Sequence, residues 1–222
     1  MTRRIDVVLF DLDGTLIDSA PDLAGACNDM RVERGLAALP YGQLRAMVGS
    51  GARGMVGTGF GIGPDDDGYA ALRDEFLMRY ESRMTRETGV FAGVPPMLAR
   101  LRESGRSWGI VTNKASRFAT PLVASLGLAE QAATLVCGDT TAHAKPHPEP
   151  LLEAARRMGV KAAACIYVGD DRRDVDAGRA AGMRTLVAAW GYLGSGEPMS
   201  AWGASGIVAA PDDVVAWIES AT

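Results

Sequence analysis

The stretch VLFDLDGTLIDSAPD, residues Val8 to Asp22, contains four aspartates, and two of them come directly after an apolar run. The run Val7–Phe10 has the length and character of a buried strand, and Asp11 and Asp13 follow it. Two carboxylates therefore lie at the carboxyl end of a predicted strand. Like charges this close repel each other, so the rest of the chain must show what stabilises them.

Apolar runs of strand length recur along the chain, and after Val90 they alternate with helical patterns. This alternation is typical of a parallel sheet with helices on both faces, so we expect an α/β fold with a Rossmann-like sheet. The expected strands are Ile5–Phe10, Trp108–Thr112, Thr134–Cys137, Cys165–Val168, Thr185–Ala188 and Ile207–Ala209. The expected helices after Val90 are Pro95–Glu103, Ser116–Leu126, Pro148–Met158, Val175–Ala181 and Pro211–Ser220.

The segment after the first strand breaks this rhythm. It contains helical patterns at Leu23–Arg34, Leu44–Val48 and Tyr69–Met84, and no convincing strand. We therefore expect a core domain of residues 1–16 and 89–222 with an inserted all-helical cap domain of residues 17–88. Between the last two of these patterns lies VGSGARGMVGTGFGIG, residues 48–63, whose glycines indicate either a flexible connection or a functional loop.

Composition excludes several classes of protein. The chain has 222 residues, 47% of them hydrophobic, and a formal net charge of −4, so we expect neither a nucleic-acid nor a membrane partner. Its three cysteines are far apart, which argues against a disulfide framework and a zinc site. The N-terminal apolar stretch is interrupted by Asp11, which predicts no signal peptide and a cytoplasmic location.

Polar residues lie at the carboxyl ends of four predicted strands or in the loops that follow them. Open α/β sheets bind their ligands at this end of the strands. Each could have a local role, such as a helix cap or a solvated turn, but their joint occurrence favours one site. Together they supply what phosphoryl transfer requires: a carboxylate nucleophile, a proton donor, donors for charged oxygens and oxygen ligands for Mg²⁺. The set is Asp11, Asp13, Thr112, Asn113, Lys145, Asp170, Asp171 and Asp174.

The motifs DLDGTLID, GIVTNK, AKP and GDDRRD occur in the order found in the haloacid dehalogenase superfamily of phosphatases, which the whole chain resembles. The resemblance implies that Asp11 attacks phosphorus. Asp13 would protonate the leaving oxygen and then activate water against the aspartyl phosphate. Thr112 and Asn113 would donate hydrogen bonds to the phosphoryl oxygens, and Lys145 would neutralise charge on the nucleophile and the phosphoryl group.

The same resemblance implies an Mg²⁺ cofactor. Asp11, Asp170 and the backbone carbonyl of Asp13 would hold the cation, and Asp171 or Asp174 would support the metal shell. His143 and His147 flank Lys145, but a proline-bearing loop does not place them on one helical face, so we expect surface histidines.

Residue types separate the activities within the superfamily. Dehalogenases lack the second aspartate of the first motif, whereas Asp13 is present here. Sugar-phosphate mutases with this cap usually carry a histidine soon after the first motif, and SAPDLAGACNDM has none. A Mg²⁺-dependent phosphomonoesterase acting on a small phosphorylated metabolite fits best, with a mutase or a non-catalytic binding protein as alternatives. The sequence does not predict the oligomeric state.

Two substrates remain open. VGSGARGMV and VTNKASRFATPLVASLGL resemble phosphoglycolate phosphatases, whereas GDDRRDVDAGRAAGMRT and EPMSAWGA resemble N-acetylmuramic acid 6-phosphate phosphatases. The last motif slightly favours the second group, because the first commonly has Ser-Arg-Asn where this chain has Asp171-Arg172-Arg173. Both substrates carry a carboxylate, so we expect Arg53, or else Arg45, to bind it.

Overall fold

The computed structural model describes residues 4–194 and 196–220. A six-stranded parallel sheet runs through it in the order β5-β4-β1-β6-β7-β8. The side chains of its third strand, β1, are at most 2% exposed, as the apolar run Val7–Phe10 predicts for a strand covered on both faces. The strands are β1 (Val7–Phe10), β4 (Ser107–Val111), β5 (Leu135–Val136), β6 (Cys165–Gly169), β7 (Arg184–Ala188) and β8 (Gly206–Val208).

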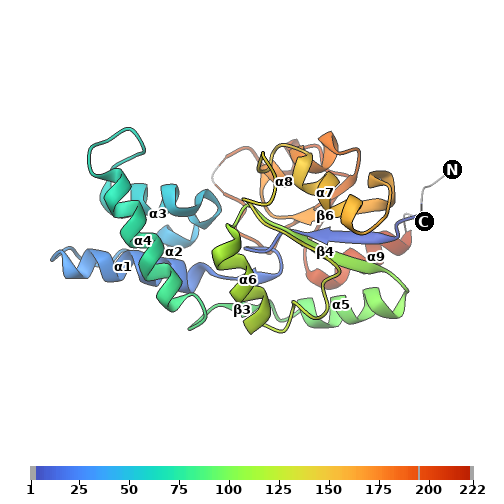
Figure 1. Ribbon diagram of the computed structural model, residues 1–222, viewed down its shortest axis with the longest axis horizontal. Coiled ribbons are helices and arrows are strands. Elements are labelled where there is room, and N and C mark those ends of the chain that lie inside the picture. Colours follow the sequence, from blue (N-terminus) through green and yellow to red (C-terminus); the bar gives the residue numbers. More distant parts are fainter. Residues whose placement is uncertain (1–3, 195, 221–222) are drawn as a thin grey trace. The chain divides into compact units, whose positions relative to one another are not determined.

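Helices cover both faces of this sheet (Figure 1). On one face, α7 (Glu149–Arg157) and α8 (Arg172–Ala180) pack against the strands, with Leu9, Leu151 and Tyr167 in one buried cluster. On the other face lie α5 (Val94–Glu103) and α9 (Pro211–Ser220), which contact each other. The sequence-based fold class is thus confirmed. The remaining helices of this part are α6 (Ser116–Ser125) and the 3₁₀ turns η2 (Ala162–Ala164) and η3 (Met199–Ala201).

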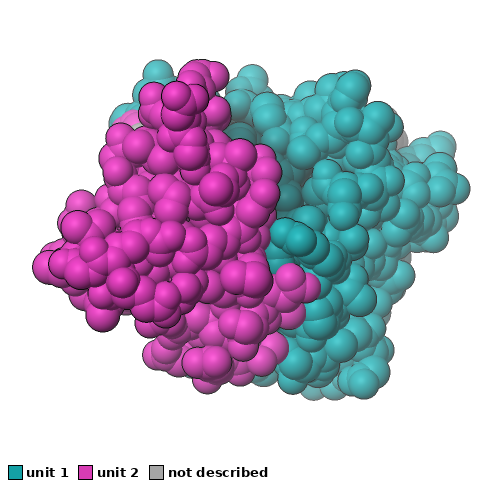
Figure 2. Space-filling model, turned by 60° about the vertical axis from the view of Figure 1, so that its left-hand side comes forward, with its two compact units in different colours: residues 1–17, 90–191, 197–222 teal, residues 18–89, 192–196 magenta. Residues whose placement is uncertain are grey.

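The chain divides into two compact units (Figure 2). The sheet unit comprises residues 1–17, 90–191 and 197–222, and the helical unit comprises residues 18–89 and 192–196. The predicted boundaries, 17–88 for the insertion, did not include residues 192–196. The chain passes between the units through β2 (Ile17–Asp18) and β3 (Gly89–Val90), which form a two-stranded sheet. These strands have two residues each, too short to produce a periodic signal in the sequence.

The helical unit contains α1 (Ala20–Glu33), α2 (Tyr41–Arg45), η1 (Val48–Ser50), α3 (Gly51–Phe60) and α4 (Tyr69–Arg83). The expectation of a connection or loop over residues 48–63 was wrong, because most of that segment is α3. One of its glycines allows close packing: a Cβ on Gly59 would lie 2.6 Å from the Sγ of Cys27 on α1. Met55 and Val56 are fully buried, so apolar burial stabilises a helix that glycine propensity alone disfavours. The predicted helix Leu44–Val48 was also misplaced, since α2 ends at Arg45.

No helix within residues 4–194 and 196–220 has the length and apolar character needed to cross a bilayer.

Candidate active site

The site is built where the carboxyl ends of three neighbouring strands meet. Because β1 pairs in parallel with both β4 and β6, the residues after these strands lie along one edge of the sheet. Asp11 follows β1, Thr112 follows β4 and Asp170 follows β6. The ladder holds two of them at the backbone: the N–H of Asp11 donates to the carbonyl of Val168, and that of Thr112 to Val136, each at 2.9 Å.

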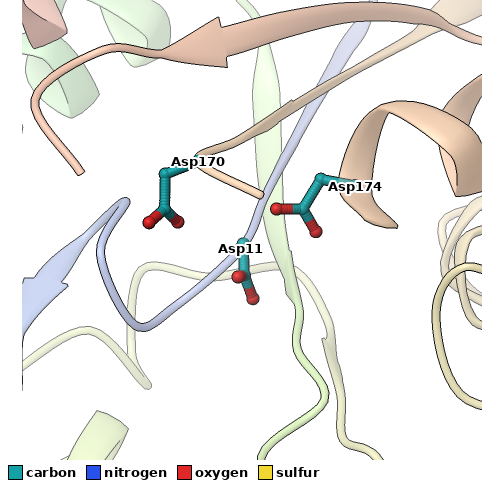
Figure 3. A group of neighbouring side chains, drawn as sticks. All are labelled: Asp11, Asp170 and Asp174. Carbon is teal, nitrogen blue, oxygen red and sulfur yellow. The ribbon is translucent and has the colours of Figure 1, made fainter. Parts of the chain in front are cut away.

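Three carboxylates converge at this edge. Oxygens of Asp11, Asp170 and Asp174 lie within 4.8 Å of one another, and Figure 3 shows them arriving from β1, from β6 and from the start of α8. Burial raises the pKa of Asp11 to about 6, against the opposing effect of the Lys145 ammonium. The buried Oδ1 of Asp11 has no hydrogen-bond partner among the described residues. Hard oxygen donors in this number, one of them unsatisfied, fit Mg²⁺.

Lys145 is the cation of this cluster. Its Nζ forms an ion pair with Oδ1 of Asp11 at 2.9 Å and donates to Oδ1 of Asp174 at 2.7 Å. Burial disfavours its charged form, but the carboxylates of Asp11 and Asp174 outweigh burial and raise the pKa of Lys145. The ammonium is therefore fixed beside the proposed nucleophile, as the sequence led us to expect.

Asp171 and Asp174 have different places. Asp171 is the N-cap of α8: its Oδ1 accepts from the N–H of Arg173 at 2.8 Å, and Oδ2 of Asp174 accepts from the N–H of Asp171 at 3.0 Å. The guanidinium of Arg173 donates hydrogen bonds to both oxygens of Asp171. Burial alone would raise the pKa of Asp171, but the bonds from Arg173 outweigh it and hold this pKa below its usual range. Only Asp174 of the two joins Asp11 and Asp170. This capping box also begins α8 at Arg172, earlier than the predicted Val175.

Glycines let the backbone approach Asp170 closely. A Cβ on Gly14 would lie 2.2 Å from Oδ2 of Asp170, and Gly14 also has φ +83°, which disfavours other residues. A Cβ on Gly191 would lie 2.2 Å from the Cβ of Asp170. The hydroxyl of Thr15 donates to Oδ1 of Asp170 at 3.0 Å. The loop after β1 thus wraps around this carboxylate.

Comparison with known proteins places the chain in a family. The model of the haloacid dehalogenase-like hydrolases matches residues 8–188. The chain belongs to this family. It is 42% identical to the N-acetylmuramic acid 6-phosphate phosphatase of Pseudomonas putida, over 98% of each chain. It is 49% identical to the phosphoglycolate phosphatase of Xanthomonas campestris pv. campestris, over 92% of each. A solved haloacid dehalogenase-like family hydrolase from Streptococcus pneumoniae shares the fold, with TM-score 0.82, 21% identity and coverage of 96% and 98%.

Asn113 and Thr112 of this haloacid dehalogenase-like hydrolase are fixed by local bonds. The side-chain amide of Asn113 donates to the backbone carbonyl of Lys145 and accepts from its N–H, each at 2.9 Å. Asn113 thereby anchors the lysine loop. The Oγ1 of Thr112 accepts from the N–H of Lys114 at 3.1 Å, which leaves its own proton to donate elsewhere.

Two residues of the hydrolase site were not predicted from the sequence. Tyr167 lies under Lys145: its hydroxyl accepts from Nζ at 2.7 Å and donates to the carbonyl of Val111 at 2.7 Å. Its position inside an apolar strand gave no functional signal. Lys114 pairs with Asp13, and its place directly after Thr112 and Asn113 in GIVTNK was the signal that could have revealed it.

The two arginines expected to recognise substrate lie in the helical unit of the hydrolase. Nη1 of Arg45 donates to Oδ1 of Asp18 at 2.7 Å, and its guanidinium lies 4.7 Å from the centre of the Tyr192 ring. Arg53 is in the first turn of α3, exposed and without a side-chain partner among the described residues. Arg45 is therefore engaged within its unit, whereas Arg53 is available to a ligand.

The histidines of the hydrolase lie on an exposed loop. The rings of His143 and His147 are 4.4 Å apart and nearly perpendicular, and the described residues around them supply no third ligand that would complete a metal site.

Proposed function

We propose that this hydrolase is a Mg²⁺-dependent phosphomonoesterase that acts through an aspartyl phosphate on Asp11. The observation that carries the proposal is the convergence of Asp11, Lys145, Asp170 and Asp174 at one sheet edge, with an ammonium 2.9 Å from Asp11. The two named relatives are phosphatases, which supports the same chemistry.

In the first half-reaction, an oxygen of Asp11 forms a bond to phosphorus while the bond from phosphorus to the substrate oxygen breaks. The leaving oxygen takes the electron pair and a proton from the carboxyl of Asp13. In the second, Asp13 takes a proton from water as the water oxygen attacks phosphorus, and the bond to Asp11 breaks to release phosphate. Lys145 and the hydroxyl of Thr112 would stabilise the charged phosphoryl oxygens throughout.

Asp11, Asp170 and the backbone carbonyl of Asp13 would hold Mg²⁺, with Asp174 supporting them. When bound, the cation offsets repulsion between these carboxylates and a dianionic phosphate. Asp11 and Asp170 differ in their surroundings: Asp170 accepts a hydrogen bond from Thr15, whereas Oδ1 of Asp11 lies 2.9 Å from the Lys145 ammonium.

The candidate substrates are N-acetylmuramic acid 6-phosphate and 2-phosphoglycolate, both small phosphorylated metabolites, and we propose that the hydrolase acts on them in the cytoplasm. The core residues contact only the phosphoryl group and the leaving oxygen, so we assign recognition of the remainder to the helical unit, acting as a cap. Arg53 would hold the substrate carboxylate as a bidentate pair, with Arg45 as the second candidate. A sugar-phosphate mutase and a non-catalytic binding protein stay as alternatives.

Phosphate release from both substrates, measured with Mg²⁺ and with excess chelator, tests the proposal. The wild-type protein should release phosphate only with Mg²⁺, and Asp11→Asn should be inactive because an amide is a poor nucleophile. Asp13→Asn should lose about 10²- to 10⁴-fold. An intact-mass increase of one phosphoryl group on quenching would reveal the aspartyl phosphate. Full activity in chelator, or an active Asp11→Asn protein, would refute the scheme, and phosphoryl transfer without phosphate release would indicate a mutase.

A further inference from the structure

Each aspartate of the first motif has its own lysine. Asp11 pairs with Lys145, whereas both oxygens of Asp13 accept from the Nζ of Lys114, at 3.0 and 3.1 Å. The Lys114 and Asp13 side chains are 9% and 20% exposed, so this pair is shielded far more than a surface ion pair. The two lysines come from different segments of the sheet unit, and removing one would leave the other in place.

The backbone of Lys114 is fixed on both sides by the site. Its N–H donates to Oγ1 of Thr112 at 3.1 Å, and its carbonyl accepts from the N–H of Gly138 at 2.9 Å. A Cβ on Gly138 would lie 2.3 Å from the carbonyl oxygen of Asn113, so the two loops meet as closely as backbones can. The side chain of Lys114 therefore extends towards Asp13 from a backbone that is held in place.

We propose that Lys114 is the positioning residue of Asp13 for both of its proton transfers, an inference that rests on the proposed function. Asp13 must face the leaving oxygen in the first half-reaction and the attacking water in the second. A carboxyl group on a loop rotates about its own side-chain bonds, and a misplacement of about 1 Å can cost 10²-fold in rate. An ammonium bonded to both oxygens of Asp13 fixes the plane of the carboxyl group, so that its remaining lone pairs exchange the proton in a set direction.

The proposal predicts a defect that depends on the leaving group. In a double displacement, kcat/KM includes only the steps up to release of the alcohol, so it isolates the step in which Asp13 donates its proton. An alkyl alkoxide needs that proton as the bond to phosphorus breaks, whereas 4-nitrophenolate leaves without it. Loss of positioning should therefore slow alkyl phosphates strongly and 4-nitrophenyl phosphate weakly.

The experiment compares kcat/KM of wild type, Lys114→Met and Lys161→Met on a series of phosphate monoesters, from 4-nitrophenyl through phenyl to alkyl. Lys161 is an exposed lysine without a side-chain partner among the residues placed in the structure, so Lys161→Met is the matched control. We expect Lys114→Met to lose on the order of 10²-fold on alkyl phosphates, several-fold on 4-nitrophenyl phosphate, and Lys161→Met to match wild type. An equal loss on every ester, or no loss, would overturn the proposal.

A second measurement tests the route through Asp13. In an Asp13→Asn background, Lys114→Met should add little further loss on alkyl phosphates, because the positioned group is already gone. If the loss in kcat/KM of the double variant equalled the product of the losses of the two single variants, Lys114 would act independently of Asp13, and the proposal would be overturned. If Lys114→Met does not fold, Lys114→Arg replaces it in both experiments, with a smaller leaving-group dependence expected because the charge is kept. A wild-type protein that releases phosphate neither from these esters nor from N-acetylmuramic acid 6-phosphate or 2-phosphoglycolate would refute the proposed function. An active wild-type protein whose Lys114→Met variant shows no dependence on the leaving group would refute only this inference.

Discussion

The ammonium of Lys145 lies 2.9 Å from Oδ1 of Asp11 and 2.7 Å from Oδ1 of Asp174, so one positive charge is shared between two carboxylates. The Lys145 side chain is 2% exposed and that of Asp11 is 13% exposed, so solvent screens little of the remaining repulsion. Asp170 adds a third carboxylate to the cluster. An excess of negative charge is thus built into the resting site, and this excess is what a divalent cation would relieve.

The first prediction concerns the stability of the metal-free protein. Burial raises the pKa of Asp11 to about 6 in the folded state, from 3.8, so its stabilising contribution is full below about pH 3.8 and is lost as the pH rises through about 6. Asp11→Asn, which cannot ionise, should therefore be more stable than wild type near pH 8 in chelator, with the difference shrinking towards pH 4. Urea unfolding at several pH values measures this.

The control for that series is Asp65→Asn, at an exposed aspartate without a side-chain partner in the part of the chain described. It should follow wild type at every pH. Added Mg²⁺ should stabilise wild type more than Asp11→Asn. A pH-independent difference between Asp11→Asn and wild type would contradict the electrostatic reading of the cluster.

The sequence predicted the sheet and the main site because both depend on local patterns at strand ends. Asp11, Lys145 and Asp170 could be brought together in advance, since parallel strands place their carboxyl ends at one edge, but the sequence did not show which of Asp171 and Asp174 joins them. The helix α3 could not be predicted in this way, because it depends on Gly59 packing against Cys27, a contact between distant segments.

Side-chain pairing was equally invisible in the sequence. Nothing in the pattern of charges showed that Arg45 is engaged by Asp18 while Arg53 is not. The position of Lys114 in GIVTNK placed it near the site, but it did not show that the ammonium pairs with Asp13. Tyr167 was missed for a different reason: in a buried strand, an aromatic residue predicts packing, and only the position of Lys145 gives its hydroxyl a role. Such contacts follow from the fold and not from the local sequence.

The second prediction tests that role of Tyr167. In Tyr167→Phe, Lys145 loses an acceptor at 2.7 Å, although the carbonyl of Val111 remains 3.1 Å from Nζ. We expect a loss of about 1–2 kcal/mol in the free energy of unfolding. Turnover should fall several-fold, because the ammonium is held less firmly beside Asp11. Tyr41→Phe removes a hydroxyl from an exposed tyrosine and should change stability by less than about 0.5 kcal/mol. Equal effects of the two variants would argue against a special role for Tyr167.

The third prediction concerns space around Asp170. Gly191→Ala would place a Cβ 2.2 Å from the Cβ of Asp170, so the carboxylate must move. We expect weaker Mg²⁺ binding, seen as a higher Mg²⁺ concentration for half-maximal activity and a smaller Mg²⁺-dependent rise in Tm. Gly42→Ala is the matched control, because nothing lies within 4 Å of its added Cβ. An unchanged Mg²⁺ requirement in Gly191→Ala would show that Asp170 tolerates displacement or does not bind the cation.

The last prediction separates recognition from chemistry. Arg53 is exposed in the first turn of α3 and has no side-chain partner among the described residues, whereas Arg45 is held by Asp18. If Arg53 binds the substrate carboxylate, Arg53→Ala should raise KM for the carboxylate-bearing substrate by about 10- to 100-fold, as expected for a lost charge-assisted hydrogen bond, with kcat nearly unchanged. Phenyl phosphate, which has no carboxylate, should be unaffected. Arg86→Ala changes another exposed arginine of the helical unit without a side-chain partner there, and both of its KM values should stay at wild type. If Arg53→Ala weakened both substrates equally, or neither, carboxylate recognition would have to be assigned to another group, because only an interaction remote from phosphorus can raise KM for one substrate and spare the other.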